Sequence, residues 1–283
     1  MKSTCSILRP CEVEKKAHSA IAAIDNSPYL GGMNELLGLP YSPWTEKARW
    51  ALDVRKVPYR FRHYQPLIGE PALRLKTRRL FGVVSVPVLT DSRGRIYDDS
   101  SKIAQFADAH GEGPSLFPPQ HQEALSHWTA LSERGLDAGR TLSLHRQLHD
   151  EEALTELVPG KLRRQLGTLA PRIGAAGLRR TLRKYDARGH SLNDHRITLC
   201  AALDELRETL GRSGASPKTV LDTFSYADIA ASQVLSFVSP PSFGLKLGKA
   251  SARGFTYDKL AEEYADLVAW RDALYEAYRP REA

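Results

Sequence analysis

A tyrosine and a serine stand directly before a predicted helix. Tyr41 and Ser42 follow the apolar segment 35–39, which predicts a strand, and they precede Pro43. Serine is a favoured N-cap and proline suits the first helical position. The positive end of a helix stabilises an anion, and a hydroxyl there can donate a hydrogen bond to it. Ser42 is therefore a candidate donor to an anion, and the alternative is that it only caps the helix.

A proline in a β-rich run marks a second candidate segment. Pro87 interrupts the apolar segment Val83–Thr90. Proline lacks the amide hydrogen of a strand ladder, so a central strand would not tolerate it. A cis Val86–Pro87 bond would leave the Val86 backbone free to pair with an extended peptide. A proline at the start of a strand explains the run equally well.

An acidic residue and a serine mark a third segment. Asp99 and Ser100 begin a predicted helix that runs to about Ala109. A serine at a helix N-terminus suits a carboxylate ligand, and an adjacent acid suits an ammonium group. Asp98 is an alternative acid. Without the other segments, a simply capped helix is an equally good interpretation.

The candidate residues lie within a series of predicted strands and helices. The sequence patterns predict the order β-α-β-α-β-β-α for this part of the chain. The first β-α-β unit is parallel, and a hairpin at residues 91–94 adds antiparallel strands to the same sheet. After a linker rich in glycine and proline, the remaining chain shows helical patterns only. The predicted helices are 120–148, 151–169, 173–186, 192–210, 226–238 and 257–278. The predicted divisions are an extension at 1–32, an α/β domain at 33–110, a linker at 111–120 and an all-α domain at 121–283.

Taken together, the segments resemble one known family. Residues 41–50, 85–89 and 98–106, in this order, resemble the glutathione-binding domain of the glutathione S-transferase superfamily. Residues 224–230 resemble that family's buried capping box, in which Ser225 caps a helix and Asp228 reaches back to it. The resemblance covers about residues 33–280. It implies a thioredoxin-like α/β domain followed by an all-helical domain.

The resemblance also implies roles for single residues. Ser42 would contact the sulfur of glutathione, with Tyr41 as the rival donor. A free thiol with a pKa near 8.5 is mostly protonated at neutral pH, so such a donor favours the reactive thiolate. The backbone at Val86–Pro87 would pair with the cysteinyl part of glutathione, and Asp99–Ser100 would hold the γ-glutamyl end.

Two departures from the family pattern limit the chemistry. Many members have a lysine just before the Val-Pro pair, but this chain has Ser85. Three nearby cations could replace it: Lys76, Arg78 and Arg79. No cysteine stands at Ser42 or Thr45, so this turn cannot cycle as a dithiol, which argues against thioredoxin or glutaredoxin chemistry.

The pocket for a second substrate is expected between the two domains. Its candidate residues are Tyr41, Trp44, Trp128, Leu131 and His145. For Trp128 and Leu131, core packing is the more economical interpretation. The nine histidines show no metal-ligand spacing, so no metal is expected.

Charge and cysteine usage narrow the class of protein. The net charge of +7 lies largely in residues 155–195, which hold nine Lys/Arg and three acids. A solvated helix face is the simplest explanation, and the segment could also reshape the pocket or a dimer interface. Binding of nucleic acid or of an anionic partner by this segment is the less favoured alternative. The three cysteines, Cys5, Cys11 and Cys200, suit a reducing compartment, most simply the cytoplasm. No secretory signal and no apolar run long enough for a membrane span is evident.

The chain is expected to be a homodimeric glutathione transferase with a role in detoxification. In this function the thiolate of glutathione attacks a small hydrophobic electrophile. Glutathione-dependent isomerisation, ether cleavage or dehalogenation would use the same thiolate. The alternative from another class is a binding or assembly protein that keeps the fold without turnover.

Overall fold

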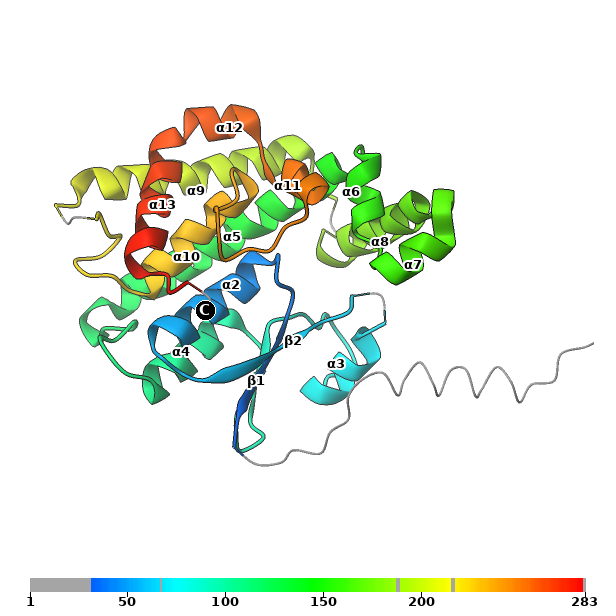
Figure 1. Ribbon diagram of the computed structural model, residues 1–283. Coiled ribbons are helices and arrows are strands. Elements are labelled where there is room, and N and C mark those ends of the chain that lie inside the picture. Colours follow the sequence, from blue (N-terminus) through cyan, green and yellow to red (C-terminus); the bar gives the residue numbers. More distant parts are fainter. Residues whose placement is uncertain (1–31, 67, 187–188, 215–216, 282–283) are drawn as a thin grey trace, which may run out of the picture. The chain divides into compact units, whose positions relative to one another are not determined.

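The computed structural model describes residues 32–66, 68–186, 189–214 and 217–281 (Figure 1). Residues 33–283 form one compact unit. Residues 1–31 of the predicted extension lie outside the described part. Within the described residues, no helix has both the length and the apolar character needed to cross a membrane.

A four-stranded mixed sheet forms the first half of the described chain. Its spatial order is β2-β1-β3-β4. β1 runs parallel to β2, and β3 runs antiparallel to β4, as the sequence predicts. β1 also pairs with β3, in the antiparallel direction. The strands are β1 (Asn34–Gly38), β2 (Tyr59–His63), β3 (Val88–Thr90) and β4 (Ile96–Tyr97).

Helices cover both faces of this sheet: α2 (Pro43–Val54), α3 (Glu70–Thr77) and α4 (Ser100–His110). Successive strand residues point to opposite faces. Leu36 on β1 is therefore buried in the main core with residues of α2 and α4. Its neighbour Leu37 packs on the other side, against Leu73 of α3. The predicted β-α-β-α-β-β-α order is confirmed.

The second half is helical, also as predicted (Figure 1). Its longer helices are α5 (Gln122–Gln147), α8 (Ala170–Tyr185), α9 (Leu192–Arg212), α10 (Tyr226–Val234) and α13 (Ala265–Tyr278). The shorter ones are α6 (Glu151–Glu156), α7 (Gly160–Leu166), α11 (Lys249–Phe255) and α12 (Asp258–Glu263). Short 3₁₀ turns precede α5, follow α7 and follow α10.

Two predicted helices are each broken in the structure. The single helix expected over 151–169 is wrong, because Pro159 lacks an amide hydrogen and disfavours helical geometry at the preceding residue. The helix expected over 257–278 is interrupted at Tyr264, whose backbone angles of φ −111° and ψ 31° lie outside the helical range. The short helix α11 was not expected from the sequence.

The predicted capping box at the start of α10 is confirmed. The Ser225 hydroxyl accepts from the Ala227 amide at 3.2 Å, and the Asp228 carboxylate accepts from the Ser225 amide at 2.8 Å. Asp228 also accepts from the Val220 amide at 2.7 Å. This carboxyl is fully buried, and burial raises its pKa to about 7.

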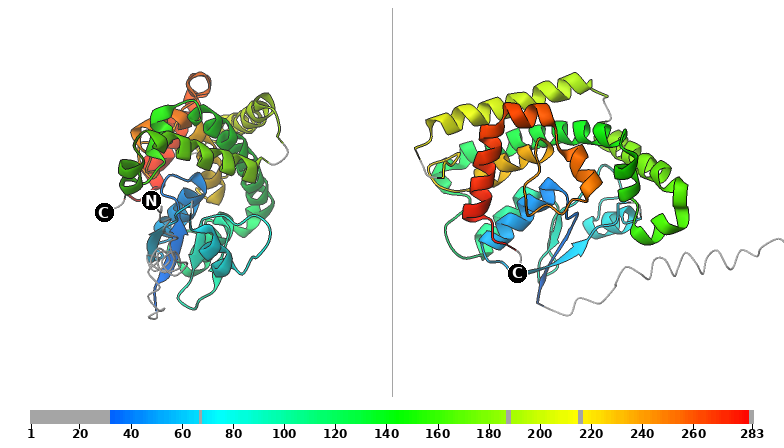
Figure 2. Two further views of the ribbon diagram at one scale, coloured as in Figure 1. Left: turned by 90° about the vertical axis from the view of Figure 1, so that its right-hand side faces the viewer. Right: turned by 45° about the horizontal axis from the view of Figure 1, so that its top comes forward.

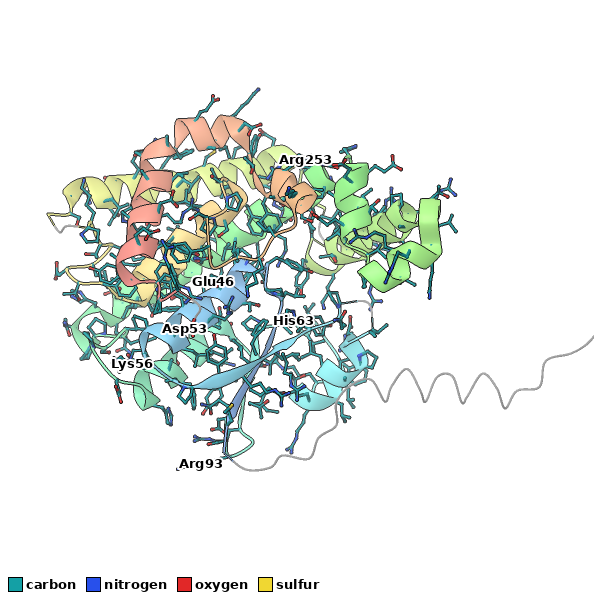
Figure 3. The ribbon with its side chains drawn as sticks, in the orientation of Figure 1. Glu46, Asp53, Lys56, His63, Arg93 and Arg253 are labelled. Atoms are coloured by element: carbon teal, nitrogen blue, oxygen red, sulfur yellow. The ribbon has the colours of Figure 1, made fainter. Side chains whose placement is uncertain are left out.

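The end of the chain's last helix is tied to α2 by a buried ion pair. The Arg279 guanidinium lies 2.6 Å from Glu46 and 2.7 Å from Asp53, two acids that lie along α2 (Figure 3). The side chains of Arg279 and Glu46 are each 1% exposed. This contact fixes α2, which begins at Ser42, to the helical half.

The helices α6, α7 and α8 lie beyond one end of α5, on the side of α3, in Figure 1 and in the right-hand view of Figure 2. An ion pair of 3.0 Å joins Arg180 of α8 to Glu70 of α3. The basic segment noted in the sequence therefore reaches across to the α/β half.

Candidate functional site

The turn between β1 and α2 holds Ser42 at the N-cap of α2. The residue is 8% exposed, and its side chain makes no capping hydrogen bond. The turn is fixed by other groups, because the Ser42 amide donates to the Leu39 carbonyl at 3.0 Å and the Leu39 amide donates to Thr45 Oγ1 at 3.2 Å. The hydroxyl of Ser42 is thus not used for capping.

The strand register brings the three predicted segments to one edge of the sheet. Leu37 of β1 pairs with Val88 of β3, so Val86–Pro87 comes beside the end of β1 that leads to Ser42. Leu89 pairs with Tyr97, so Asp99 follows β4 at the same edge. The Val86–Pro87 peptide bond is cis, as considered from the sequence, and it precedes the first paired residue of β3.

Ser100 places an unpaired hydroxyl at this edge. The residue is 2% exposed, and its Oγ has no hydrogen-bond partner among the described residues. The hydroxyl of Tyr226, on the first residue of α10, is likewise buried without a partner meeting hydrogen-bond geometry. Burial raises the pKa of the Tyr226 phenol, and the nearby Ser100 hydroxyl partly offsets that rise. Buried polar atoms without partners are uncommon and mark places where a ligand could supply one.

The two neighbouring acids have separate partners. Asp99 caps α4, because its Oδ1 accepts from the amides of Ser101 at 2.8 Å and Lys102 at 3.3 Å. Asp98 pairs with Arg79 at 2.5 Å and with Lys102 at 3.0 Å. Burial alone would raise the pKa of Asp98, but these two cations lower it. Asp99 is exposed and Asp98 is neutralised, so Asp99 is the better placed of the two to meet an ammonium group.

Of the three cations considered as substitutes for the missing lysine, two are already paired. Lys76 lies 2.8 Å from Glu35, and Arg79 is held by Asp98. Arg78 is exposed, with the left-handed backbone that ends α3. A fourth cation was missed in the sequence: Lys184 of α8, whose Nζ lies 2.6 Å from the main-chain oxygen of Val84. The basic segment 155–195 was the only sign of Lys184 in the sequence. No local sequence pattern could show that Lys184 contacts Val84, because the two residues are 100 positions apart.

An aromatic and charged group lies beside the start of α2. Trp44 donates from Nε1 to Glu133 of α5 at 2.6 Å, and the buried Lys47 also pairs with Glu133. The Arg140 guanidinium lies 4.8 Å from the centroid of the Trp44 ring and 3.9 Å from that of the Tyr185 ring. Arg140 and Tyr185 were not predicted from the sequence, and they connect α5 and α8 to the first turn of α2.

Tyr41 is half-buried in the apolar cluster that includes Trp44, Leu136 and Phe237. Burial raises the pKa of its phenol to about 12. The phenol therefore stays protonated at neutral pH and can donate a hydrogen bond. Tyr41 and Ser42 are adjacent in sequence, so either could serve a ligand at this turn.

Apart from Tyr41, the four residues expected to line a second-substrate pocket are not gathered on one surface. Trp128 and Leu131 are 5% and 4% exposed and belong to the main core, which favours the packing interpretation. His145 is half-buried in the last turn of α5. Trp44 alone lies next to Ser42 and in the cluster that contains Tyr41.

Part of the chain is similar in sequence to known proteins. Residues 36–115 match the family described as glutathione S-transferase, N-terminal domain. A probable glutathione S-transferase from Solanum tuberosum is 32% identical over 97 residues, which cover 34% of this chain and 43% of the potato protein. The α/β half of the chain is thus similar to the N-terminal domain of glutathione S-transferases.

Solved structures of other proteins share the fold of this chain. A glutathione S-transferase of Ceriporiopsis subvermispora, in complex with glutathione, gives a TM-score of 0.58 at 18% identity, covering 89% of this chain and 99% of that one. The β-etherase LigF of Sphingobium sp. strain SYK-6 gives 0.56 at 16% identity, covering 86% and 95%. At this level of identity the likeness concerns the fold, and the expected fold class is confirmed.

Proposed function

We propose that the chain binds glutathione at the sheet edge formed by the β1–α2 turn, Val86–Pro87 and Asp99–Ser100, and activates its thiol for attack on an electrophile. The observation that carries the proposal is the Ser42 hydroxyl, which lies at the positive end of α2 and makes no capping bond. A donor in that position favours a thiolate over a thiol.

The rest of the edge suits the other parts of the tripeptide. The main chain at Val86 lies just beyond the β3 ladder, so it could pair with the cysteinyl backbone. The unpaired Ser100 hydroxyl suits the γ-glutamyl carboxylate, and the exposed Asp99 suits the ammonium group. The residues present therefore fit glutathione, and Lys184 is a cation that contacts the loop just before the Val-Pro pair.

The proposed reaction is a nucleophilic displacement or addition. The thiol proton leaves to solvent on binding, and the thiolate forms a sulfur–carbon bond to the electrophile. A leaving group departs with the electron pair in a displacement, or a proton is taken up in an addition. The contribution of the chain is positioning together with stabilisation of the sulfur anion.

The second substrate would meet Tyr41 and Trp44, with Arg140 stacked against the Trp44 ring. These groups suit a small, largely apolar electrophile. Isomerisation, ether cleavage or dehalogenation would use the same thiolate, and a β-etherase is among the proteins that share the fold. A protein that keeps the fold for binding or assembly alone is the alternative without turnover.

We further propose a homodimer in the cytoplasm. An apolar surface surrounds the end of α3, made of Leu75, Leu80, Phe81 and Val83, which are 79%, 75%, 89% and 52% exposed. Such a group of exposed apolar side chains, close together in the sequence, suits a second copy of the chain. The half-buried free thiol of Cys200 is compatible with a reducing compartment.

The experiment that tests the proposal is glutathione binding to the wild type and to the Ser42→Ala variant, with proton release as the readout. Proton release on glutathione binding that occurs in the wild type and is lost in Ser42→Ala supports the proposed function. Absence of glutathione binding would overturn it.

A further inference from the structure

We propose that Asp186, His190 and His195 form a binding site for a zinc-like divalent cation at the junction of α8 and α9. Ligand atoms of these three residues all lie within 4.8 Å of one another. The sequence spacing gave no sign of this, because the residues sit on both sides of a helix junction rather than on one helical face. The inference does not depend on glutathione binding.

The distances suit metal coordination as well as the long hydrogen bond that joins His195 to Asp186 in this structure. His190 Nδ1 lies 3.5 Å from Asp186 Oδ1, and His195 Nε2 lies 3.4 Å from Asp186 Oδ2. Good hydrogen bonds between nitrogen and oxygen are shorter, about 2.7–3.2 Å. A zinc ion about 2.0–2.1 Å from each ligand separates tetrahedral neighbours by about 3.4 Å. Each carboxylate oxygen therefore already faces one imidazole at close to the spacing of two ligands.

The three side chains combine fixed and accessible ligands. Asp186 and His195 are 12% and 13% exposed, whereas the His190 side chain is 52% exposed. Two ligands are thus held by the protein, and the third can rotate to close on an ion arriving from solvent. Three protein ligands leave a coordination position for water.

The two helix ends hold the ligands in place. Asp186 directly follows α8, and its amide donates to the Leu182 carbonyl at 2.7 Å. His195 lies in the first turn of α9, whose N-cap Ser191 forms a capping box with Asp194.

The surroundings indicate which cations would bind. Residues 155–195 carry an excess of positive charge, which opposes any cation held by charge alone. Magnesium and calcium rely on several oxygen ligands, and one carboxylate does not provide them. Imidazole nitrogen suits zinc, nickel, cobalt and copper. The site should therefore take Zn²⁺ or Co²⁺ and reject Mg²⁺.

An occupied site would tie the end of α8 to α9. Lys184 and Tyr185, which contact Val84 and Arg140, immediately precede Asp186. The ion would hold these two residues in the positions described above.

The test is Zn²⁺ titration of the full-length chain in competition with a chromophoric chelator. The wild type should bind one Zn²⁺ at least tenfold more tightly than His190→Ala or His195→Ala. His149→Ala, which removes an exposed histidine at the end of α5, should bind like the wild type. Mg²⁺ should not compete.

Two further readouts separate a site from a folding defect. His190 is exposed, so His190→Ala should unfold at the wild-type temperature without metal, while Zn²⁺ raises the melting temperature of the wild type only. Co²⁺ should give the visible absorption of a tetrahedral site in the wild type and not in His190→Ala. Equal Zn²⁺ affinity and stoichiometry in the wild type and both histidine variants would overturn the proposal.

Discussion

The Nζ atom of Lys184 lies 2.6 Å from the main-chain oxygen of Val84, two residues before the cis Val86–Pro87 bond. This hydrogen bond joins the basic helix α8 to the loop that carries the candidate peptide-pairing backbone. Burial lowers the pKa of Lys184, although the nearby Glu70 favours its charged form. The added basic segment is therefore a structural neighbour of the proposed site rather than a detached surface.

Lys184→Ala should loosen the loop before β3. A hydrogen bond from a charged donor contributes about 1.5–3 kcal/mol to the free energy of unfolding. Because the Lys184 side chain is partly exposed, the contribution of its bond to Val84 should lie near the lower end of that range. Hydrogen exchange of the amides at 83–86 should become faster, with a modest loss of stability to denaturant. Arg179→Ala removes an equal charge from an exposed position on the same helix and should change neither. Unchanged exchange in Lys184→Ala would refute the assignment.

Arg279→Ala should be strongly destabilising. It leaves Glu46, which is 1% exposed, without its main partner, and breaking a buried pair typically costs about 3–5 kcal/mol. Arg281→Ala removes an exposed partner of Glu276 and should cost less than about 1 kcal/mol. Denaturant unfolding of the two variants compares them directly, and similar losses would contradict a special role for the buried pair.

The stability of the fold should depend on pH through Asp228. Its pKa is about 7 in the folded chain, above the ordinary value of 3.8. The folded state therefore holds the proton more tightly, so this contribution to stability is complete below about pH 4 and is lost as the pH rises to 7. The stability of the wild type relative to Asp228→Asn should fall across that interval, by at most about 1.4 kcal/mol per pH unit.

Urea unfolding of both proteins at several pH values measures the difference. Groups other than Asp228 titrate in both chains and cancel in the comparison. A difference that is constant, or that grows with pH, would show that the carboxyl is ionised in the folded state throughout.

The apolar surface at the end of α3 should be a dimer contact. Sedimentation at micromolar concentration should show a dimer for the wild type and a monomer for the combined Leu80→Ser and Phe81→Ser variant. Ile197→Ser, which changes a residue of α9 that is 53% exposed, should remain dimeric. A monomeric wild type would reject the homodimer, and a dimeric double variant would place its interface elsewhere.

Local signals in the sequence were enough for the order of elements along the chain and for several helix starts. Ser42–Pro43 and the Ser225–Asp228 box act within one turn, so their residue types alone indicate the helix N-termini. The contacts of Lys184 and Arg140 join distant segments and depend on how helices pack, which no local pattern encodes. The same holds for Asp186 and His195, which only the junction of two helices brings together. The break at Pro159 was predictable from its missing amide hydrogen.

The central claim is that this edge of the sheet binds glutathione as a thiolate held by Ser42. Calorimetry in two buffers of different ionisation enthalpy measures both binding and the number of protons released. The wild type should bind glutathione at neutral pH and release close to one proton. Ser42→Ala should bind with little release, and Tyr41→Phe should behave like the wild type. Equal release by the wild type and Ser42→Ala, or no binding at millimolar glutathione, would contradict the account.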